Sequence, residues 1–292
     1  MNERPGQGML YLCATPIGNL SDISERVLET LRSVDIIAAE DTRNSLKLLN
    51  HFGIKVPLTS YHEYNKYDKA NELIDKMADG KSVALITDAG TPAISDPGEV
   101  LADMCHNAGI RVTSLPGPCA LVTALSMSGM PSRRFVFEGF LPSDKKERKR
   151  ILEELRDETR TIILYEAPHH LKTTLAQLYE TLGDRRIALC RELTKKFEQT
   201  IRMRMAEAAV YYEDKEPKGE YVLIIEGRSQ SLVDEEKADA WRRKDINEHM
   251  ALYESEGLDR KEAMKKVAAD RGMSKRDVYR QLLEKEENGS KE

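Results

Sequence analysis

Short apolar runs alternate with longer amphipathic segments through the first 130 residues. The apolar runs have the length of buried strands, and the segments between them repeat apolar residues at helical spacing. Strands are expected at residues 9–14, 34–39, 57–60, 82–87 and 110–115, and helices near 23–33, 43–51, 67–79, 98–108 and 118–128. Strands that alternate with helices predict a mostly parallel α/β domain.

The segment Gly129-Met130-Pro131-Ser132 interrupts this alternation and is typical of a hinge between domains. Beyond it, strands are expected at residues 134–139, 160–165, 186–190, 197–204 and 220–226, and helices near 143–156, 168–182 and 205–213. The last two strands follow each other closely, which suggests a mixed sheet with an antiparallel part. We therefore expect one α/β domain over residues 1–130 and a second over 131–228.

The rest of the chain is polar and then helical. Residues 229–243 are predicted to be a linker, and residues 244–292 a helical C-terminal domain. Helix-turn-helix-like spacing is carried by Val267, Ala268, Gly272 and Val278, and Ser274 with Asp277 forms a capping box. Such a turn can present a helix to nucleic acid, but the charges here are nearly balanced. A small accessory or dimerisation bundle is an equally good interpretation.

Three loops rich in Gly, Pro and small residues follow three of the expected strands. They are Ala14 to Leu20, Asp88 to Gly98 and Pro116 to Ala120. Open α/β sheets bind ligands at the carboxyl ends of their strands, so these loops predict a ligand site at one sheet edge. Neither G-x-G-x-x-G nor G-x-x-x-x-G-K-[ST] occurs after a strand, which argues against a dinucleotide fingerprint or a P-loop.

Composition narrows the class of protein. The 292 residues are 40% hydrophobic and 33% charged, without an apolar run near the ~20 residues that span a bilayer. The N-terminus lacks the apolar region of a secretory signal, so we expect a cytoplasmic protein without membrane contact. The four cysteines are scattered, and neighbouring His169 and His170 are poorly placed for chelation, so no disulfide and no metal are expected.

A net charge of −5 means that any contact with nucleic acid must be local. The densest basic run is Lys145-Lys146-Glu147-Arg148-Lys149-Arg150, which opens an expected helix. A solvated helix face explains this run as well as an RNA contact does.

Eight sequence blocks resemble a known family. They are ATPIGNLSDIS (14–24), AEDTRNS (39–45), SYHEYN (60–65), ITDAGTPAISDPG (86–98), LPGPCA (115–120), FEGFLP (137–142), LYEAPHHL (164–171) and RELTKKFE (191–198). These blocks are similar to the 16S ribosomal RNA 2′-O-methyltransferases, within the tetrapyrrole-methylase-like superfamily, and the tail resembles the C-terminal domain of that family. The chain differs from the family pattern at Tyr64, where His is frequent, and at residues 167–170, where Ser-Pro-His-Arg is frequent.

The resemblance implies two α/β lobes with a cofactor cleft between them and a small all-helical C-terminal domain. The implied cofactor is S-adenosyl-L-methionine, and the implied substrate is a cytidine in the decoding region of 16S rRNA in the small ribosomal subunit. A homodimer is also implied. The residues expected at the cofactor are Pro16, Asp88, Ala89, Gly90, Thr91, Pro92, Ser95, Pro116, Gly117, Cys119, Ala120, Tyr165, Ala167, Leu193, Gly219 and Glu220.

Transfer of a methyl group to a ribose hydroxyl depends mainly on holding the reacting atoms in line, and a general base assists as the proton leaves. The catalytic candidates are Asp41, His62, Glu63 and Glu192, and Glu40 or Lys195 remain open as bases. RNA contacts are expected at Arg43, Tyr61, Asn65, Lys145, Lys146, Arg148, Lys149 and Arg150. Arg43 is poorly explained as part of a helix start, because a cation there is mildly unfavourable unless a phosphate is bound.

Two alternatives stay open. The acceptor can be a tetrapyrrole or another small molecule, as elsewhere in the superfamily, although those proteins have a Gly-rich turn in place of ATPIGNL. A non-catalytic RNA-binding module would leave the three ligand loops unexplained.

Overall fold

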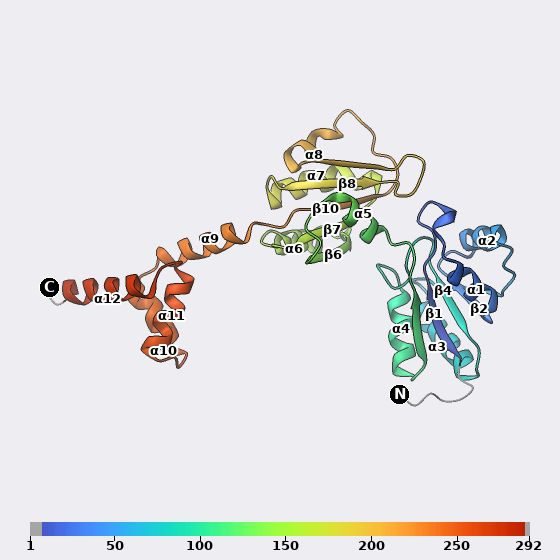
Figure 1. The fold of residues 1–292 in the computed structure, drawn as a ribbon, viewed down its shortest axis with the longest axis horizontal. Coiled ribbons are helices and arrows are strands. Elements are labelled where there is room, and N and C mark those ends of the chain that lie inside the picture. Colours follow the sequence, from blue (N-terminus) through green and yellow to red (C-terminus); the bar gives the residue numbers. More distant parts are fainter. Residues whose placement is uncertain (1–7, 290–292) are drawn as a thin grey trace. The chain divides into compact units, whose positions relative to one another are not determined.

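The computed structural model describes residues 8–289, which divide into two compact units (Figure 1). The first unit holds residues up to 155 and 160–226, and the second holds 156–159 and 227 onward. The N-terminal residues that bear on a secretory signal, and the last three of the expected C-terminal domain, lie outside the described residues.

The first lobe of unit 1 is a five-stranded parallel sheet in the order β3-β2-β4-β1-β5. Its strands are β1 (Met9–Cys13), β2 (Ile36–Ala39), β3 (Leu58–Ser60), β4 (Val83–Ile86) and β5 (Arg111–Leu115), and its helices are α1 (Glu25–Ser33), α2 (Thr42–His51), α3 (Lys66–Ala78) and α4 (Gly98–Asn107), with a short 3-10 turn η1 (Leu20–Asp22). The expected parallel α/β domain is confirmed.

Alternation along the strands divides the core of this lobe into two layers. Val83 and Leu85 of β4 pack against α3 and α4, whereas Ala84 and Ile86 pack against α1 and α2. Successive strand residues point to opposite faces, so a strand covered on both faces is apolar throughout. The neighbouring order β4-β1-β5 brings the three ligand loops to one edge of the sheet, as predicted.

The second lobe is a mixed sheet in the order β6-β7-β10-β8-β9. Its strands are β6 (Phe135–Phe140), β7 (Thr161–Glu166), β8 (Arg186–Arg191), β9 (Gln199–Arg204) and β10 (Tyr221–Ile225), and helices α6 (Lys145–Leu155), α7 (Pro168–Leu182) and α8 (Met205–Tyr211) supply its larger core. The predicted antiparallel part is present. However, β10 does not pair with the preceding β9; it lies between β7 and β8.

Helix α5 (Ala120–Ser128) corrects the expected domain boundary at residue 130. Leu121, Ala124 and Leu125 are buried against Ile163 and Val222 of the second sheet. The chain therefore crosses between lobes in the loop before α5, not at Gly129. The sequence showed an apolar helix but not which sheet it covers.

Unit 2 contains α9 (Gln230–Arg242), α10 (Ile246–Ser255), α11 (Arg260–Asp270) and α12 (Lys275–Gly289). Residues 229–243 were expected to be a linker, and this prediction is wrong. They form α9, because Val233 and Ala238 supply buried positions within an otherwise polar stretch. The helix-turn-helix-like spacing holds: Val267, Ala268 and Val278 are buried together, and Ser274 caps α12 by accepting from the Asp277 N–H at 3.2 Å.

None of the helices in the described part of the chain combines the length and apolar character that crossing a membrane requires.

Candidate active site

The three ligand loops of the first lobe are hydrogen-bonded to one another. The backbone N–H and C=O of Thr15 pair with those of Gly90 at 2.9 and 3.0 Å. The Thr15 hydroxyl donates to the Thr87 carbonyl at 3.1 Å, and the Thr91 hydroxyl donates to the Pro118 carbonyl at 2.9 Å. These bonds link the loops at the carboxyl ends of β1, β4 and β5 to one another.

The loop after β4 has a strained backbone that one carboxylate holds in place. Ala93 and Ser95 have φ values of 68° and 64°, in the left-handed region that favours glycine. Asp96 accepts N–H groups from Ala93, Ile94 and Gly98 at 2.8–3.1 Å. This sharply folded loop presents its backbone toward the second lobe.

A second strained loop follows β8 in the second lobe. Glu192 and Thr194 have φ values of 50° and 62°, and Glu198 accepts the Thr194 N–H at 2.6 Å. Within residues 8–289, the non-glycine residues with positive φ are these two together with Ala93 and Ser95. Such strain persists where the surrounding structure imposes it, and it concentrates at ligand sites. Both loops are therefore strong candidates for binding a ligand.

Two glycines let the lobes approach closely beside these loops. A Cβ at Gly18 would lie 2.8 Å from the Leu193 carbonyl oxygen and 2.4 Å from Cγ of Lys195. A Cβ at Gly139, at the bulge in β6, would lie 2.9 Å from Oγ of Ser95. Side chains at either position would push the loops apart.

A cavity of about 370 Å³ lies between the strained loops. That volume is within the range of small-molecule sites. The expected cofactor residues that line it are Asp88, Ala89, Gly90, Thr91, Ser95, Ala120, Tyr165, Leu193 and Glu220. Candidate bases Glu40, Glu192 and Lys195 line it as well.

Other expected cofactor residues do not line this cavity. They are Pro92, Pro116, Gly117, Cys119, Ala167 and Gly219, whereas Pro16 lines a neighbouring cavity instead. Gly117 packs on the first strand end, since a Cβ there would lie 2.8 Å from Cβ of Ala14. The cavity is also lined by residues that were not expected from the sequence: Ile17, Thr87, Ile94, Asp96, Phe140 and Val222. Ile94 and Asp96 lie within the expected ligand loop Asp88 to Gly98.

Tyr165 forms an aromatic wall of the cavity at the end of β7. Its ring packs edge-on against Phe137 and Phe140 at centroid distances of 4.9 and 5.5 Å. The Tyr165 hydroxyl oxygen accepts the Leu121 N–H at 3.2 Å. Burial raises the pKa of Tyr165 to about 12, so the hydroxyl keeps its proton at neutral pH.

Glu192 also lines the cavity and is held in an ion pair. Lys195 Nζ lies 2.9 Å from Glu192 Oε1 and 3.8 Å from Glu220 Oε2. A Cβ at Gly219 would lie 2.3 Å from the same Glu192 oxygen, so this glycine leaves room for the Glu192 side chain. The arrangement offers both charges to the zwitterionic end of a ligand.

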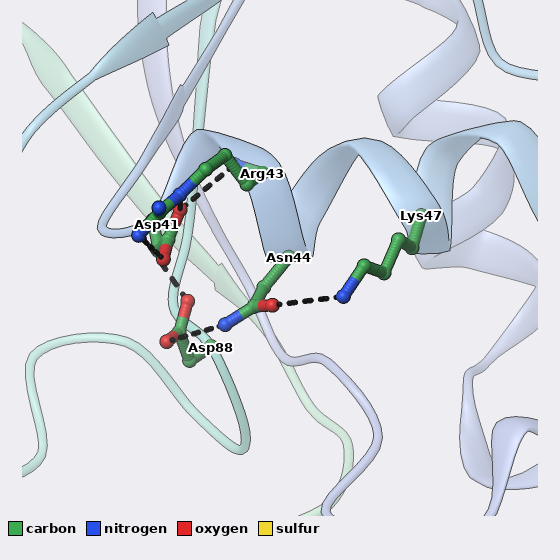
Figure 2. Close-up of polar contacts among 5 residues, drawn as sticks. All are labelled: Asp41, Arg43, Asn44, Lys47 and Asp88. Carbon is green, nitrogen blue, oxygen red and sulfur yellow. Dashed lines mark hydrogen bonds and ion pairs between the residues drawn. The ribbon is translucent and has the colours of Figure 1, made fainter.

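Among the remaining acidic candidates, Asp41 and Glu63 are held in local ion pairs. Asp41 caps α2 by accepting the Arg43 N–H at 2.8 Å, and its carboxylate pairs with the Arg43 guanidinium at 3.0 Å (Figure 2). The hydrogen bond from Arg43 holds the pKa of Asp41 below its ordinary value. Glu63 pairs with Lys66 at 2.5 Å.

Glu40 differs from both. Glu40 is an exposed residue, yet desolvation of its carboxyl group raises its pKa above the ordinary value of 4.5; the charges of Asp88 and Asp96 raise the pKa further, and the charge of His62 opposes the shift. His62 Nδ1 is buried without a hydrogen-bond partner. A carboxylate with a raised pKa on the wall of a cavity is suited to accept a proton.

Two of the expected RNA contacts beside His62 serve local structure. Tyr61 is 1% exposed in the core of the first lobe, and its hydroxyl donates to the Pro97 carbonyl at 2.9 Å. It therefore cannot stack on a base, and this prediction is wrong; the exposed tyrosine of the segment is Tyr64, at 97%. Asn65 accepts the His62 N–H at 2.8 Å and stabilises its own loop.

The basic run at the start of α6 divides into two kinds of residue. Arg148 donates to Gln177 at 2.7 Å and to Thr174 at 2.6 Å, and its side chain is only 13% exposed. Arg148 thus joins α6 to α7 and is not available as an RNA contact, contrary to our prediction. Lys145, Lys146 and Lys149 are exposed, and Arg150 pairs with Glu154 at 2.7 Å on the helix surface.

No cluster of three or more His, Cys, Asp or Glu side chains suited to a metal ion occurs in the described part of the molecule.

Comparison with known proteins identifies relatives of this chain. The model of a family described as Tetrapyrrole (Corrin/Porphyrin) Methylases matches residues 9–209. A protein named ribosomal RNA small subunit methyltransferase I from Halalkalibacterium halodurans is 47% identical over 277 residues, which cover 95% of each chain. The protein of that name from Thermotoga maritima is 44% identical over 221 residues, which cover 76% of this chain and 99% of its own.

A crystal structure of diphthine synthase superposes with a TM-score of 0.58. The match covers 76% of this chain and 91% of that one, at 15% identity, so it shows a common fold alone.

Proposed function

Since the chain belongs to the tetrapyrrole methylase family, and within it to the ribosomal RNA small subunit methyltransferase I family, we propose which methyl donor and acceptor it uses. The donor is S-adenosyl-L-methionine, and the acceptor is the ribose 2′-hydroxyl of a cytidine in the decoding region of 16S rRNA. The relatives' name supports methylation of the small-subunit RNA. The observation that carries the site is the pair of strained loops facing the cavity.

The cavity residues fit the proposed cofactor. Glu192, Lys195 and Glu220 offer charges of both signs to its amino and carboxylate groups. The rings of Tyr165 and Phe140 offer an aromatic surface, which favours a sulfonium cation by cation–π attraction. Ala89, Gly90 and Ala120 let the backbone approach closely. When bound, the cofactor supplies an electrophilic methyl carbon.

Among the candidate bases, Glu40 is best suited to take the proton of the ribose hydroxyl. Asp41, Glu63 and Glu192 are each engaged in an ion pair with a neighbouring cation, and the hydrogen bond from Arg43 lowers the pKa of Asp41, which weakens it as a base. Glu40 has a raised pKa and lines the cavity. His62, by contrast, does not line this cavity.

The protein also acts, in this proposal, in the cytoplasm as a homodimer on assembled small subunits. The exposed lysines of the basic run, Lys145, Lys146 and Lys149, supply local positive charge on a chain of net charge −5. Such local charge suits a contact with phosphates of the subunit RNA.

The test is transfer of labelled methyl from S-adenosyl-L-methionine to small ribosomal subunits from cells lacking this protein. Label in the 16S rRNA is the predicted result. A tetrapyrrole acceptor that takes label while subunits do not would replace the proposed substrate. Thermal unfolding is a parallel check, because a cofactor at ~100 times its Kd stabilises the fold by about 2.7 kcal/mol.

A further inference from the structure

A second cavity, of about 350 Å³, adjoins the proposed cofactor cavity. Thr87 and Asp88 line both. The second cavity continues from there along α2, where Asn44, Ser45, Lys47 and His51 line it, and the loop after β1 closes its other side. A molecule in this cavity would therefore reach the methyl donor across the end of β4.

Hydrogen-bond donors gather on the α2 side of this cavity. Ser45 is 4% exposed, and its Oγ has no hydrogen-bond partner. A buried polar group without a partner carries a desolvation cost, which a bound acceptor would remove. No acidic side chain in the described part of the structure forms an ion pair with Lys47, whose ammonium group donates to Asn44 Oδ1 at 3.5 Å. The exposed His51 adds an imidazole at the far end.

At the end nearest the cofactor cavity, the side chain that lines the cavity accepts hydrogen bonds instead of donating them. Asp88 accepts the Asp41 N–H at 3.3 Å through Oδ1 and the Asn44 amide at 3.4 Å through Oδ2 (Figure 2). The Asn44 amide thus stands between the Asp88 carboxylate and the Lys47 ammonium. The cavity has an accepting end, suited to hydroxyl groups, and a donating end, suited to an anion.

We propose that this second cavity is the acceptor subsite and binds the ribose-phosphate backbone of the RNA. This assignment rests on the proposed function and adds the orientation of the RNA backbone in the cavity. A phosphate lies by Ser45, Lys47 and His51, and the ribose hydroxyls lie toward Asp88 and the methyl donor. A carboxylate accepts from hydroxyls and repels phosphate, whereas lysine attracts phosphate, so the reverse orientation is unfavourable.

The experiment measures binding of the full-length protein to unmodified small ribosomal subunits from cells lacking it, between about 50 and 200 mM salt. Lys47→Gln should raise the Kd by about tenfold, as for loss of a hydrogen bond to a charged group. It should also reduce the slope of log K against log salt by about 0.7, the value for one single-strand phosphate. Lys55→Gln, an exposed lysine on the same lobe, is the matched control and should change neither.

Ser45→Ala should affect the stability of the protein and its binding to subunits in different ways. Its hydroxyl has no partner in the protein, so removing it should leave the free energy of unfolding unchanged or higher. The Kd for subunits should nevertheless rise, and the Kd for S-adenosyl-L-methionine, measured by calorimetry, should stay the same.

The outcomes separate the two proposals. If the wild-type chain methylates subunits but Lys47→Gln matches Lys55→Gln in Kd and salt slope, the subsite is overturned and the proposed function stands. If the wild-type chain transfers no methyl group to subunits, the proposed function fails, and the subsite fails with it.

Discussion

The hydroxyl oxygen of Tyr165 accepts a hydrogen bond from the backbone N–H of Leu121 at 3.2 Å. This bond joins the end of β7 to the first turn of α5, directly after the loop that crosses between the lobes. Residues from both ends of the bond, Tyr165 and Ala120, line the proposed cofactor cavity. The Tyr165 hydroxyl thus helps to position two parts of the cavity lining, the end of β7 and the start of α5.

Tyr165→Phe should lower the free energy of unfolding by about 1 kcal/mol, because the Leu121 N–H at the start of α5 loses its acceptor. It should also weaken binding of S-adenosyl-L-methionine, which calorimetric titration measures. Tyr179→Phe removes an exposed hydroxyl from α7 and is the control. Equal behaviour of the two variants would show that the bond does not shape the cavity.

Gly219→Ala should weaken cofactor binding by roughly tenfold, the cost of losing one hydrogen bond to a charged group. The new Cβ would lie 2.3 Å from Glu192 Oε1 and would displace the carboxylate that pairs with Lys195.

Gly183→Ala separates this effect from backbone strain. Gly183 also has positive φ, 76° against 78° at Gly219, but nothing lies within 4 Å of its Cβ position. Gly183 has ψ −168°, a backbone region open almost only to glycine, so this variant should lose about 1–3 kcal/mol of stability to strain and keep its cofactor affinity. Loss of affinity in both variants would rule out a specific effect through Glu192.

Glu40→Gln should lower kcat by about 10²-fold or more, the usual contribution of a positioned base, without changing the Kd for the cofactor. In the wild-type enzyme kcat should rise with pH through the Glu40 pKa, and the variant should lack this rise. A variant with normal turnover would exclude Glu40 as the base.

The same substitution should change stability in a pH-dependent manner. The pKa of Glu40 is raised in the folded state, so its stabilising contribution is fully present below the unfolded value and is lost as pH rises through the folded pKa. Glu40→Gln should match the wild type below pH 4.5 and become the more stable protein at neutral pH. Denaturant unfolding at the two pH values measures the difference in stability between the variant and the wild type. A variant less stable than the wild type at neutral pH would contradict this prediction.

Arg148→Ala should lower the free energy of unfolding by about 1–3 kcal/mol, because Gln177 loses its donor and the buried Glu166 carboxylate loses the nearby cation. The neighbouring Lys149→Ala removes an exposed cation and should be close to neutral in stability. Urea denaturation of both variants tests whether Arg148 stabilises the fold and Lys149 does not. If Lys149→Ala proved as destabilising as Arg148→Ala, the structural role of Arg148 would not be specific.

A chain ended after Glu226 should retain its affinity for S-adenosyl-L-methionine, because all residues that line the cofactor cavity lie in unit 1. We expect reduced activity on small subunits if the helical unit contacts RNA. Full activity of the shortened chain would assign unit 2 a role outside RNA binding. Loss of cofactor affinity in a folded shortened chain would contradict the placement of the site.

The strands and helices of unit 1 were predictable because apolar runs such as Val83–Ile86 have buried-strand length and are bounded by turn residues. The sequence did not predict which sheet each helix covers. Helix α5 follows the first sheet in sequence yet packs on the second. The position of β10 between β7 and β8 likewise depends on long-range pairing that no local pattern contains.

At the site, sequence identified the loops but not the states of individual side chains. Arg148 lies in a basic run, and only the fold brings it to α7. Tyr61 and Tyr64 are neighbours in one motif, yet one is buried and the other exposed. The raised pKa of Glu40 arises from desolvation of its carboxyl group and from the carboxylates of Asp88 and Asp96, which are distant in sequence.

The chemical identity of the methylated nucleoside decides whether this protein methylates the ribose of a cytidine in 16S rRNA. Small subunits labelled by this protein would be digested to nucleosides, and the labelled nucleotide mapped in the 16S rRNA. We expect 2′-O-methylcytidine at a single position in the decoding region. Label on a base rather than a ribose would contradict this expectation.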